Sequence, residues 1–267
     1  MKKMIALMLA LVMVFALAAC GGSSNEPSAE GEETGLKTAV AGTLTMATNA
    51  TFPPYEFLQG SEVVGIDVEI AQAIAVKLGL ELVVEDMEFN AINVAVSTGK
   101  ADLGLAGMTV TPERLEEVNF TVPYATGIQV VLVPEGSPIT SVDDLFAEGA
   151  NNIVGVQMST VADTYASGDI EEAGLGSVDR YSKTADAIQA MKSGKVDCVI
   201  VDNEPGKAFV EQIDGLVMLE TEYAVEDYAA SMSKDNEALF EAVNGAIEEL
   251  IADDTIGTII EKYIPSK

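Results

Sequence analysis

The chain has 267 residues with 43 acidic and 14 basic side chains, a formal net charge of −29 and no histidine. Such acidity argues against nucleic acid as a partner, because Lys and Arg must displace its counterions, and against lying flat on anionic lipid. The absence of histidine excludes Ser-His and Cys-His nucleophiles, histidine-ligated metals and histidine acid–base chemistry. Since the sequence also contains no Walker loop, no dinucleotide glycine fingerprint and no cysteine pairs, we expect neither a cofactor nor a metal ion.

The first 20 residues have the pattern of an export signal. Lys2 and Lys3 precede an uncharged apolar run over residues 4–19, which is typical of a signal peptide. The run ends in Leu17-Ala18-Ala19-Cys20, which resembles the lipobox of bacterial lipoproteins and implies lipidation of Cys20. An uncleaved helical anchor and an ordinary cleaved signal are the alternatives. Residues 21–42 are predicted to form a flexible acidic linker, since their first part is small, polar and acidic.

Strands and helices alternate in the part of the chain that follows. The pattern predicts strands at 43–48, 82–84 and 102–105, helices at 67–78 and 90–98, and a turn-rich segment at 51–57. Gly79 and Gly99 follow the two helices, as expected where helices end. This alternation predicts an α/β fold with parallel βαβ units, which bind ligands at the carboxyl ends of their strands.

The segment from Gly107 to Arg114, directly after the third strand, is suited to holding a carboxylate. Gly107 lets a ligand approach the backbone closely, and Thr109 offers a hydroxyl group. Thr111 is expected to cap a helix that begins at Pro112. Arg114 would then emerge from the first turn, where its guanidinium can make two parallel hydrogen bonds to an anion. The alternative is a capped surface helix with a solvated Arg114.

The alternation then restarts. Strands are predicted at 129–133, 153–156, 198–201, 217–219 and 229–232, and helices after Ser141, after Thr160, and at 185–193, 239–250 and 256–263. Gly99-Lys100-Ala101-Asp102 and Gly194-Lys195-Val196-Asp197 repeat one pattern of helix end and strand start, which indicates two similarly built lobes. Cys198 lies in an apolar run, so burial in the core is favoured over a role as nucleophile.

Taken together, these segments resemble the bacterial extracellular solute-binding proteins of family 3, the amino-acid receptors of ABC importers. The resemblance covers nearly the whole chain after the linker and is strongest at Thr51-Phe52-Pro53-Pro54-Tyr55-Glu56-Phe57, Gly65-Ile66-Asp67-Val68, Gly99-Lys100-Ala101-Asp102, residues 107–114, Val122-Pro123-Tyr124 and Val201-Asp202. It implies a two-lobed α/β fold of the periplasmic-binding-protein type II, with two hinge-crossing strands. The first lobe would comprise residues 43–127 and 228–267, and the second residues 128–227.

The resemblance also implies how an amino acid would be bound. Arg114 would hold the α-carboxylate with help from Gly107 and Thr109, and Thr160 would reach the same group from the second lobe. Asp202 would accept hydrogen bonds from the α-ammonium. Two of these residues have structural alternatives, since Asp202 and Thr160 could each cap a helix. Opposite charges suit a zwitterion, which is costly to bury unpaired.

Four further positions bear on the ligand's side chain. Phe52 and Phe89 match positions whose rings flank that side chain, although either could serve the core alone. Asn49 matches a position that often carries Asp in relatives that bind cationic or amide side chains. Its neutrality argues against lysine and arginine and favours a neutral polar or apolar L-amino acid. Ser159 stands where many relatives have Gly, so it is expected to add a hydroxyl contact or to narrow the pocket.

The sequence therefore predicts a monomeric, lipid-anchored, extracytoplasmic receptor rather than an enzyme. Its expected partners are a free amino acid, the permease subunits of an ABC transporter and the membrane, reached through Cys20. One alternative is an enzyme of the cyclohexadienyl dehydratase type on the same fold, for which Glu88 is the candidate general acid. The other is a sensory lipoprotein without a transporter.

Overall fold

The computed structural model describes residues 35–265. The predicted signal peptide, Cys20 and most of the predicted linker lie outside the described residues. Within residues 35–265, no helix has both the length and the apolar composition that crossing a membrane requires. Three β-sheets organise this part of the chain, two of five strands and one of three.

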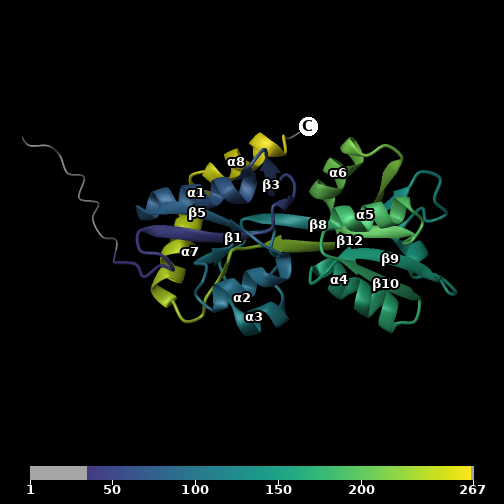
Figure 1. Cartoon of the computed structure of the whole chain (residues 1–267), viewed down its shortest axis with the longest axis horizontal. Coiled ribbons are helices and arrows are strands. Elements are labelled where there is room, and N and C mark those ends of the chain that lie inside the picture. Colours follow the sequence, from purple (N-terminus) through teal and green to yellow (C-terminus); the bar gives the residue numbers. More distant parts are fainter. Residues whose placement is uncertain (1–34, 266–267) are drawn as a thin grey trace, which may run out of the picture. The chain divides into compact units, whose positions relative to one another are not determined.

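The first five-stranded sheet has the order β5-β1-β6-β13-β7. Its strands are β1 (Thr43–Thr48), β5 (Glu81–Asp86), β6 (Leu103–Gly104), β7 (Asn119–Phe120) and β13 (Ser231–Met232). β1 pairs in parallel with β5 and β6, as the alternation predicts, whereas β13 is antiparallel to β6 and β7. The helices of this first lobe are α1 (Ile66–Leu78), α2 (Ile92–Ser97), α3 (Pro112–Glu117), α7 (Glu237–Ala252) and α8 (Thr255–Tyr263), and Figure 1 shows them around the sheet.

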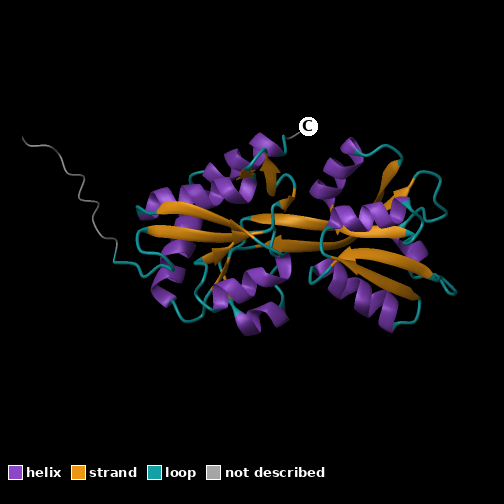
Figure 2. Ribbon diagram, in the orientation of Figure 1, coloured by secondary structure: helices purple, strands orange, loops and turns teal. Residues whose placement is uncertain are grey.

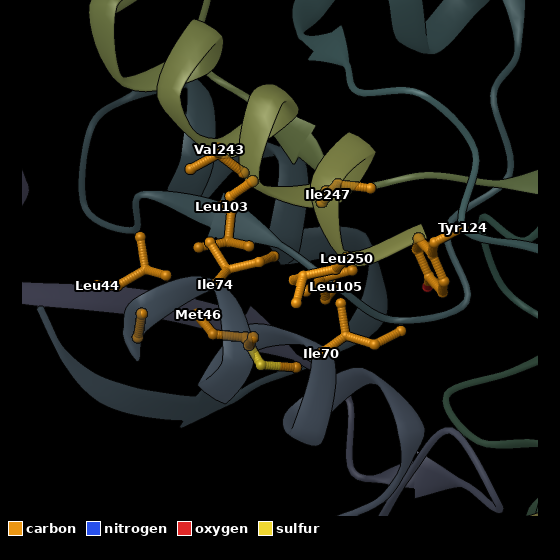
Figure 3. Close-up of a cluster of buried hydrophobic side chains, with 14 of the residues drawn as sticks. Leu44, Met46, Ile70, Ile74, Leu103, Leu105, Tyr124, Val243, Ile247 and Leu250 are labelled. Atoms are coloured by element: carbon orange, nitrogen blue, oxygen red, sulfur yellow. The ribbon is translucent and has the colours of Figure 1, made fainter. Parts of the chain in front are cut away.

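Hydrophobic residues cover both faces of this sheet. The larger cluster joins β1 and β6 to α1 and α7 (Figure 3) and includes Leu44, Met46, Ile70, Ile74, Leu103, Val243 and Ile247. Ala47 of β1 points to the other face, where it packs with Ile92 and Val96 of α2. Successive side chains of a strand point to opposite faces of the sheet, so both faces present apolar side chains that helices cover. The carboxyl ends of the strands remain available to a ligand.

The second five-stranded sheet has the order β10-β9-β11-β8-β12. Its strands are β8 (Ala125–Pro134), β9 (Asn152–Gln157), β10 (Gly176–Tyr181), β11 (Cys198–Asp202) and β12 (Leu216–Tyr228), and β9 is parallel to both β10 and β11. The helices of this second lobe are η2 (Val142–Leu145), α4 (Val161–Ala166), η3 (Ser167–Glu172), α5 (Thr184–Lys192) and α6 (Asn203–Gln212). Cys198 is fully buried in this sheet, as predicted.

Two long strands connect the lobes. β8 and β12 pair antiparallel from Ala125 and Tyr228 at one end to Pro134 and Leu216 at the other, with register shifts around Glu222. The ribbon in Figure 2 shows both strands running from one group of helices and strands to the other. They are the two hinge-crossing strands that the sequence predicts.

The structure contains several elements that the sequence prediction lacks, and one predicted strand is longer than expected. The turn-rich segment contributes to a third sheet, formed by β2 (Thr51–Phe52), β3 (Glu56–Gln59) and β4 (Glu62–Val64), and η1 (Phe89–Ala91) precedes α2. β10 is absent from the prediction, because only Val178 among its residues is buried. β12 extends well beyond residues 217–219, because its acidic second half is held by pairing with β8.

The end of the predicted linker contacts the first lobe. Leu36 packs against the larger cluster, and the Lys37 carbonyl accepts a hydrogen bond from Asn236 Nδ2 at 2.8 Å. The Ala39 N–H donates to Asp102 Oδ1 at 2.7 Å. These contacts attach residues 36–39 to the first lobe.

Candidate ligand-binding site

A pocket lies where the carboxyl ends of β1, β6, β9 and β11 approach one another. Eight of the nine predicted ligand-binding residues line it: Asn49, Phe52, Phe89, Gly107, Thr109, Arg114, Thr160 and Asp202. The lining also includes Glu56, Ala106, Gln157 and Val161. The segment after β6 is fixed against the end of β12 by a bridge between Thr109 and Tyr228 and by a hydrogen bond from Ala229 N to the Met108 carbonyl, 3.0 Å.

Arg114 is presented by the short helix α3. Thr111 caps this helix, accepting a hydrogen bond from Arg114 N at 3.2 Å, with Pro112 at the first position as predicted. The guanidinium donates to the Thr109 carbonyl at 2.7 Å and, across the pocket, to the Ser159 carbonyl at 3.1 Å. It also lies 5.5 Å from the centre of the Phe89 ring. Burial lowers the pKa of Arg114 to about 10, so the group stays cationic at neutral pH.

Asp202 ends β11 and supplies the pocket's opposite charge. It occupies the position that precedes α6, yet its side chain makes no capping hydrogen bond. Instead, the Tyr228 hydroxyl donates to Asp202 Oδ1. Gly127, in β8, makes this contact possible, because a Cβ there would collide with the Tyr228 hydroxyl. Burial raises the pKa of Asp202 to about 7, against the lowering effect of the Tyr228 hydrogen bond.

Both the backbone conformation and the packing at position 107 favour glycine. Its φ of +53° lies in the left-handed region, and a Cβ would stand 2.7 Å from Cε1 of Phe52. Its N–H donates to Asp67 Oδ2 at 2.8 Å. The group that packs closely against Gly107 is thus the Phe52 ring, and the absence of a side chain at Gly107 leaves room for this ring in the pocket wall.

The Thr109 hydroxyl donates its proton in a hydrogen bond to another residue of the protein. Oγ1 donates to Glu226 Oε2 at 2.9 Å, and Gln129 Nε2 donates to the same oxygen at 3.3 Å. Glu226 lies on β12 and Gln129 on β8, so this buried group ties the site to both crossing strands. Burial raises the pKa of Glu226, whereas its hydrogen bonds and the Arg114 charge lower it. The Thr109 hydroxyl therefore offers the pocket a lone pair rather than a proton.

Asn49 and Gln157 join the two lobes. Gln157 Nε2 donates to Asn49 Oδ1 at 3.0 Å, and the same oxygen accepts from Thr51 Oγ1 at 2.8 Å. Asn49 Nδ2 donates to the Met87 carbonyl at 2.7 Å. Both ends of the Asn49 amide are thus engaged within the protein, on the wall of the pocket.

Thr160 and Ser159 both make hydrogen bonds within the protein. The Thr160 hydroxyl accepts from Asp163 N at 3.4 Å as the cap of α4 and donates to the Gln157 carbonyl at 2.8 Å. Ser159 is the one predicted residue outside the pocket lining. Its φ of +64° is left-handed, which explains why glycine suits this position, and its carbonyl accepts from Arg114.

Two polar residues of the pocket lining, Glu56 and Gln157, have no role in the sequence prediction. Glu56 lies within the motif quoted for the turn-rich segment, and a single acid between Tyr55 and Phe57 was the available signal. Gln157 ends a strand of buried apolar residues, a place where a polar side chain often meets a ligand. Glu88 does not line this pocket but a neighbouring one that it shares with Phe89.

A family model for bacterial extracellular solute-binding proteins, family 3, matches residues 44–266, and the chain belongs to this family. The arginine-binding extracellular protein ArtP of Bacillus subtilis (strain 168) is 33% identical over a match 266 residues long, which covers 98% of this chain and 98% of that protein. Both the family and the type II periplasmic-binding-protein fold predicted from the sequence are confirmed.

Two solved structures illustrate the range of related proteins. An ancestral arginine-binding protein bound to glutamine is 36% identical with a TM-score of 0.77, covering 85% of this chain and 100% of that chain. The ancestral amino acid-binding protein AncCDT-1, a precursor of cyclohexadienyl dehydratase, is 27% identical with a TM-score of 0.74, covering 83% and 95%.

Proposed function

We propose that this protein is the receptor of an amino-acid ABC importer and closes two lobes around a zwitterionic amino acid. The observation that carries the proposal is that Arg114 and Asp202, contributed by different lobes, line one pocket. One cation and one anion match the two ends of a free amino acid, which neither lobe would neutralise alone. The lobes would comprise residues 43–127 with 228–267, and residues 128–227.

The hydrogen bonds of Arg114 and Thr109 support a proposal for how the two ends of the ligand are oriented. One N–H group of Arg114 donates to the Ser159 carbonyl. A carboxylate would be a stronger acceptor for that donor. Because the Thr109 hydroxyl already donates to Glu226, its free lone pair suits the α-ammonium beside Asp202. We therefore revise the expected role of the Thr109 hydroxyl from the carboxylate to the ammonium. With about 1.5–3 kcal/mol for each hydrogen bond to a charged group, three or four reach micromolar affinity after the costs of ordering.

Closure follows from the division of the site. A ligand that contacts groups on both lobes has a higher affinity for the closed arrangement, so it shifts the population toward closure. A permease would then distinguish a loaded receptor from an empty one by its shape. Lipidation at Cys20 would keep the receptor at the outer face of the membrane, near that permease.

The ligand's side chain is proposed to be neutral. Asn49 and Gln157 face the pocket as amides, without the carboxylate that would attract a cation at position 49. A cationic amino acid is the second candidate, because ArtP is named for arginine and Glu56 lines the pocket with both carboxyl oxygens free of protein donors. An enzymatic role finds no support in Glu88, which lies outside the pocket lining.

A thermal-shift panel of the twenty amino acids on the mature domain tests the proposal. A ligand at about 100 times its dissociation constant adds about 2.7 kcal/mol to the free energy of unfolding, which is readily seen as a higher Tm. We expect at least one neutral amino acid to stabilise the protein. If all twenty are silent at millimolar concentration and no ligand copurifies, the amino-acid proposal is rejected, and turnover of prephenate or arogenate becomes the next assay.

A further inference from the structure

Two buried carboxyl groups, Glu56 and Asp67, meet beside the pocket. Glu56, in β3, lines the pocket and is 1% exposed, and Asp67, in the first turn of α1, is fully buried. Their carboxyl groups are close enough to each other to share a hydrogen bond. A carboxylate can only accept, so a hydrogen bond between two carboxyl groups requires a proton on one of them.

The hydrogen-bond donors around Glu56 and Asp67 show which of their carboxyl oxygens lack a partner. Asp67 Oδ2 accepts from Gly107 N and from the Tyr124 hydroxyl, both at 2.8 Å. Asp67 Oδ1 and both oxygens of Glu56 have no donor among the other described residues. A proton on Glu56 that is donated to Asp67 satisfies two of these three oxygens. The third, on Glu56, is left for whatever occupies the pocket.

The surroundings place the proton on Glu56. Burial raises the pKa of Glu56 well above its ordinary value, and the charged groups that add most to this effect, Asp67, Asp202 and Asp86, are all acidic. Burial raises the pKa of Asp67 only to about 6, because Gly107 and the Tyr124 hydroxyl stabilise its charge. Tyr55, which adjoins Glu56, is itself kept neutral by burial.

We propose that Glu56 holds a proton shared with Asp67 and presents its other oxygen to the ligand's side chain as an uncharged acceptor. This inference rests on the proposed amino-acid binding and narrows its ligand class to neutral side chains that carry N–H or O–H donors. A cationic side chain would bind only with ionisation of Glu56. The O–H bond of Glu56 breaks, its proton passes to the solvent, and the ligand's cation then faces two adjacent carboxylates.

The two ligand classes should therefore differ in their proton balance. Binding of any zwitterion also ionises Asp202 to some extent, because its pKa is about 7 before the ligand arrives. That contribution is common to all amino acids and cancels when two ligands are compared at one pH. Isothermal titration calorimetry with L-glutamine and L-arginine, each in two buffers of different ionisation enthalpy, counts the protons released.

We expect arginine to release about one proton more than glutamine, so that the arginine-to-glutamine affinity ratio rises up to about tenfold per pH unit. Glu56→Gln keeps the size of the side chain and donates permanently to Asp67. It should weaken arginine binding more than glutamine binding and abolish the extra proton. Glu62→Gln, an exposed position in the same three-stranded sheet, should leave both counts unchanged. Equal proton counts for the two ligands in the unaltered protein would overturn the proposal.

A measurement without ligand separates this proposal from the proposed function. The infrared band of a protonated carboxyl group should be present in the ligand-free protein at pH 7 and lose intensity in Glu56→Gln but not in Glu62→Gln. If the band depends on Glu56 while no amino acid binds, the shared proton stands and amino-acid binding fails. If ligands bind but no such band depends on Glu56, the shared proton is disproved. Should Glu56→Gln not fold, the proton counts of the unaltered protein decide.

Discussion

The two lobes share a motif at the strand ends remote from the pocket. In the first, Gly99 ends a helix with φ +71° and Asp102 Oδ2 accepts from Thr45 N of the neighbouring strand at 2.8 Å. In the second, Gly194 has φ +72° and Asp197 Oδ2 accepts from the N–H of Ile153 at 2.7 Å. The repeated sequence Gly-Lys-Xaa-Asp thus performs one task twice, closing a helix and fastening two parallel strands.

At the opposite strand ends the lobes differ. The first lobe presents a cation on a capped helix, and the second presents an anion at the end of a central strand. The difference teaches that the scaffold is duplicated while the chemistry is assigned to the segments after the strands. Changes at the pocket ends should therefore affect ligand binding, whereas changes at the remote ends should affect stability.

The largest effect is expected for Arg114→Ala. Removal of the guanidinium leaves the ligand's carboxylate buried without a counter-charge, which costs about 3–5 kcal/mol, or at least roughly a hundredfold in affinity. Titration calorimetry with the best ligand of the thermal-shift panel measures this loss. Arg180→Ala is the matched control, because Arg180 pairs with Asp163 and Glu171 of its own lobe and does not line the pocket. Similar losses in both variants would contradict the assigned role.

Asp202→Asn should separate binding from stability. Because burial raises the pKa of Asp202 to about 7, the folded protein holds this proton more tightly than the unfolded chain. Its stabilising contribution is full below pH 4 and is lost as the pH rises through about 7, at up to about 1.4 kcal/mol per pH unit. The variant lacks this loss, so its free energy of unfolding should exceed that of the parent increasingly from pH 4 to 8.

The same substitution should abolish amino-acid binding, since the neutral amide cannot balance the α-ammonium. Denaturant titrations at several pH values and calorimetry with the ligand provide the two measurements. Buried acids that the Asp202 charge does not influence affect both proteins equally and cancel in the difference, whereas Glu56, whose pKa that charge helps to raise, does not. A stability difference that does not grow with pH would show that Asp202 is already ionised in the ligand-free protein.

The smallest effects are expected for substitutions at the strand ends remote from the pocket. Asp102→Ala deprives two backbone N–H groups of their acceptor, that of Thr45, which is buried, and that of Ala39. Its cost should be about 1–3 kcal/mol. Asp197→Ala frees the more exposed N–H of Ile153 and should cost about 1 kcal/mol or less. Chemical denaturation ranks the two, and ligand affinity should be unchanged in both; the reverse ranking would contradict the burial argument.

Much of the fold was predictable because its signals are local. β1, α1 and α3 follow from apolar periodicity, from Gly79 and from the Thr111–Pro112 cap, all of which act within a few residues. β10 and the second half of β12 carry no such signal, since their neighbours in the sheet hold them in place. Local propensity cannot report a pairing partner that lies far away in the sequence.

Most of the pocket lining was predictable from the sequence, but the hydrogen bonds around the pocket were not. Arg114, Asp202 and Phe52 could be placed by the family resemblance, and they do line one pocket. That Tyr228 engages Asp202 depends on β12 crossing beside Gly127, a tertiary contact that no sequence spacing reveals. The contact between Glu56 and Asp67 is hidden for the same reason.

The attachment of residues 36–39 has a mechanical consequence. Their hydrogen bonds go to Asn236 and Asp102, both in the part of the chain that packs around the first sheet. Tension applied from the N-terminal side would accordingly be borne at these two side chains before it reached β8 or β12. A tether attached on the N-terminal side would therefore transmit force to the first lobe only, and the second lobe could still move relative to the first.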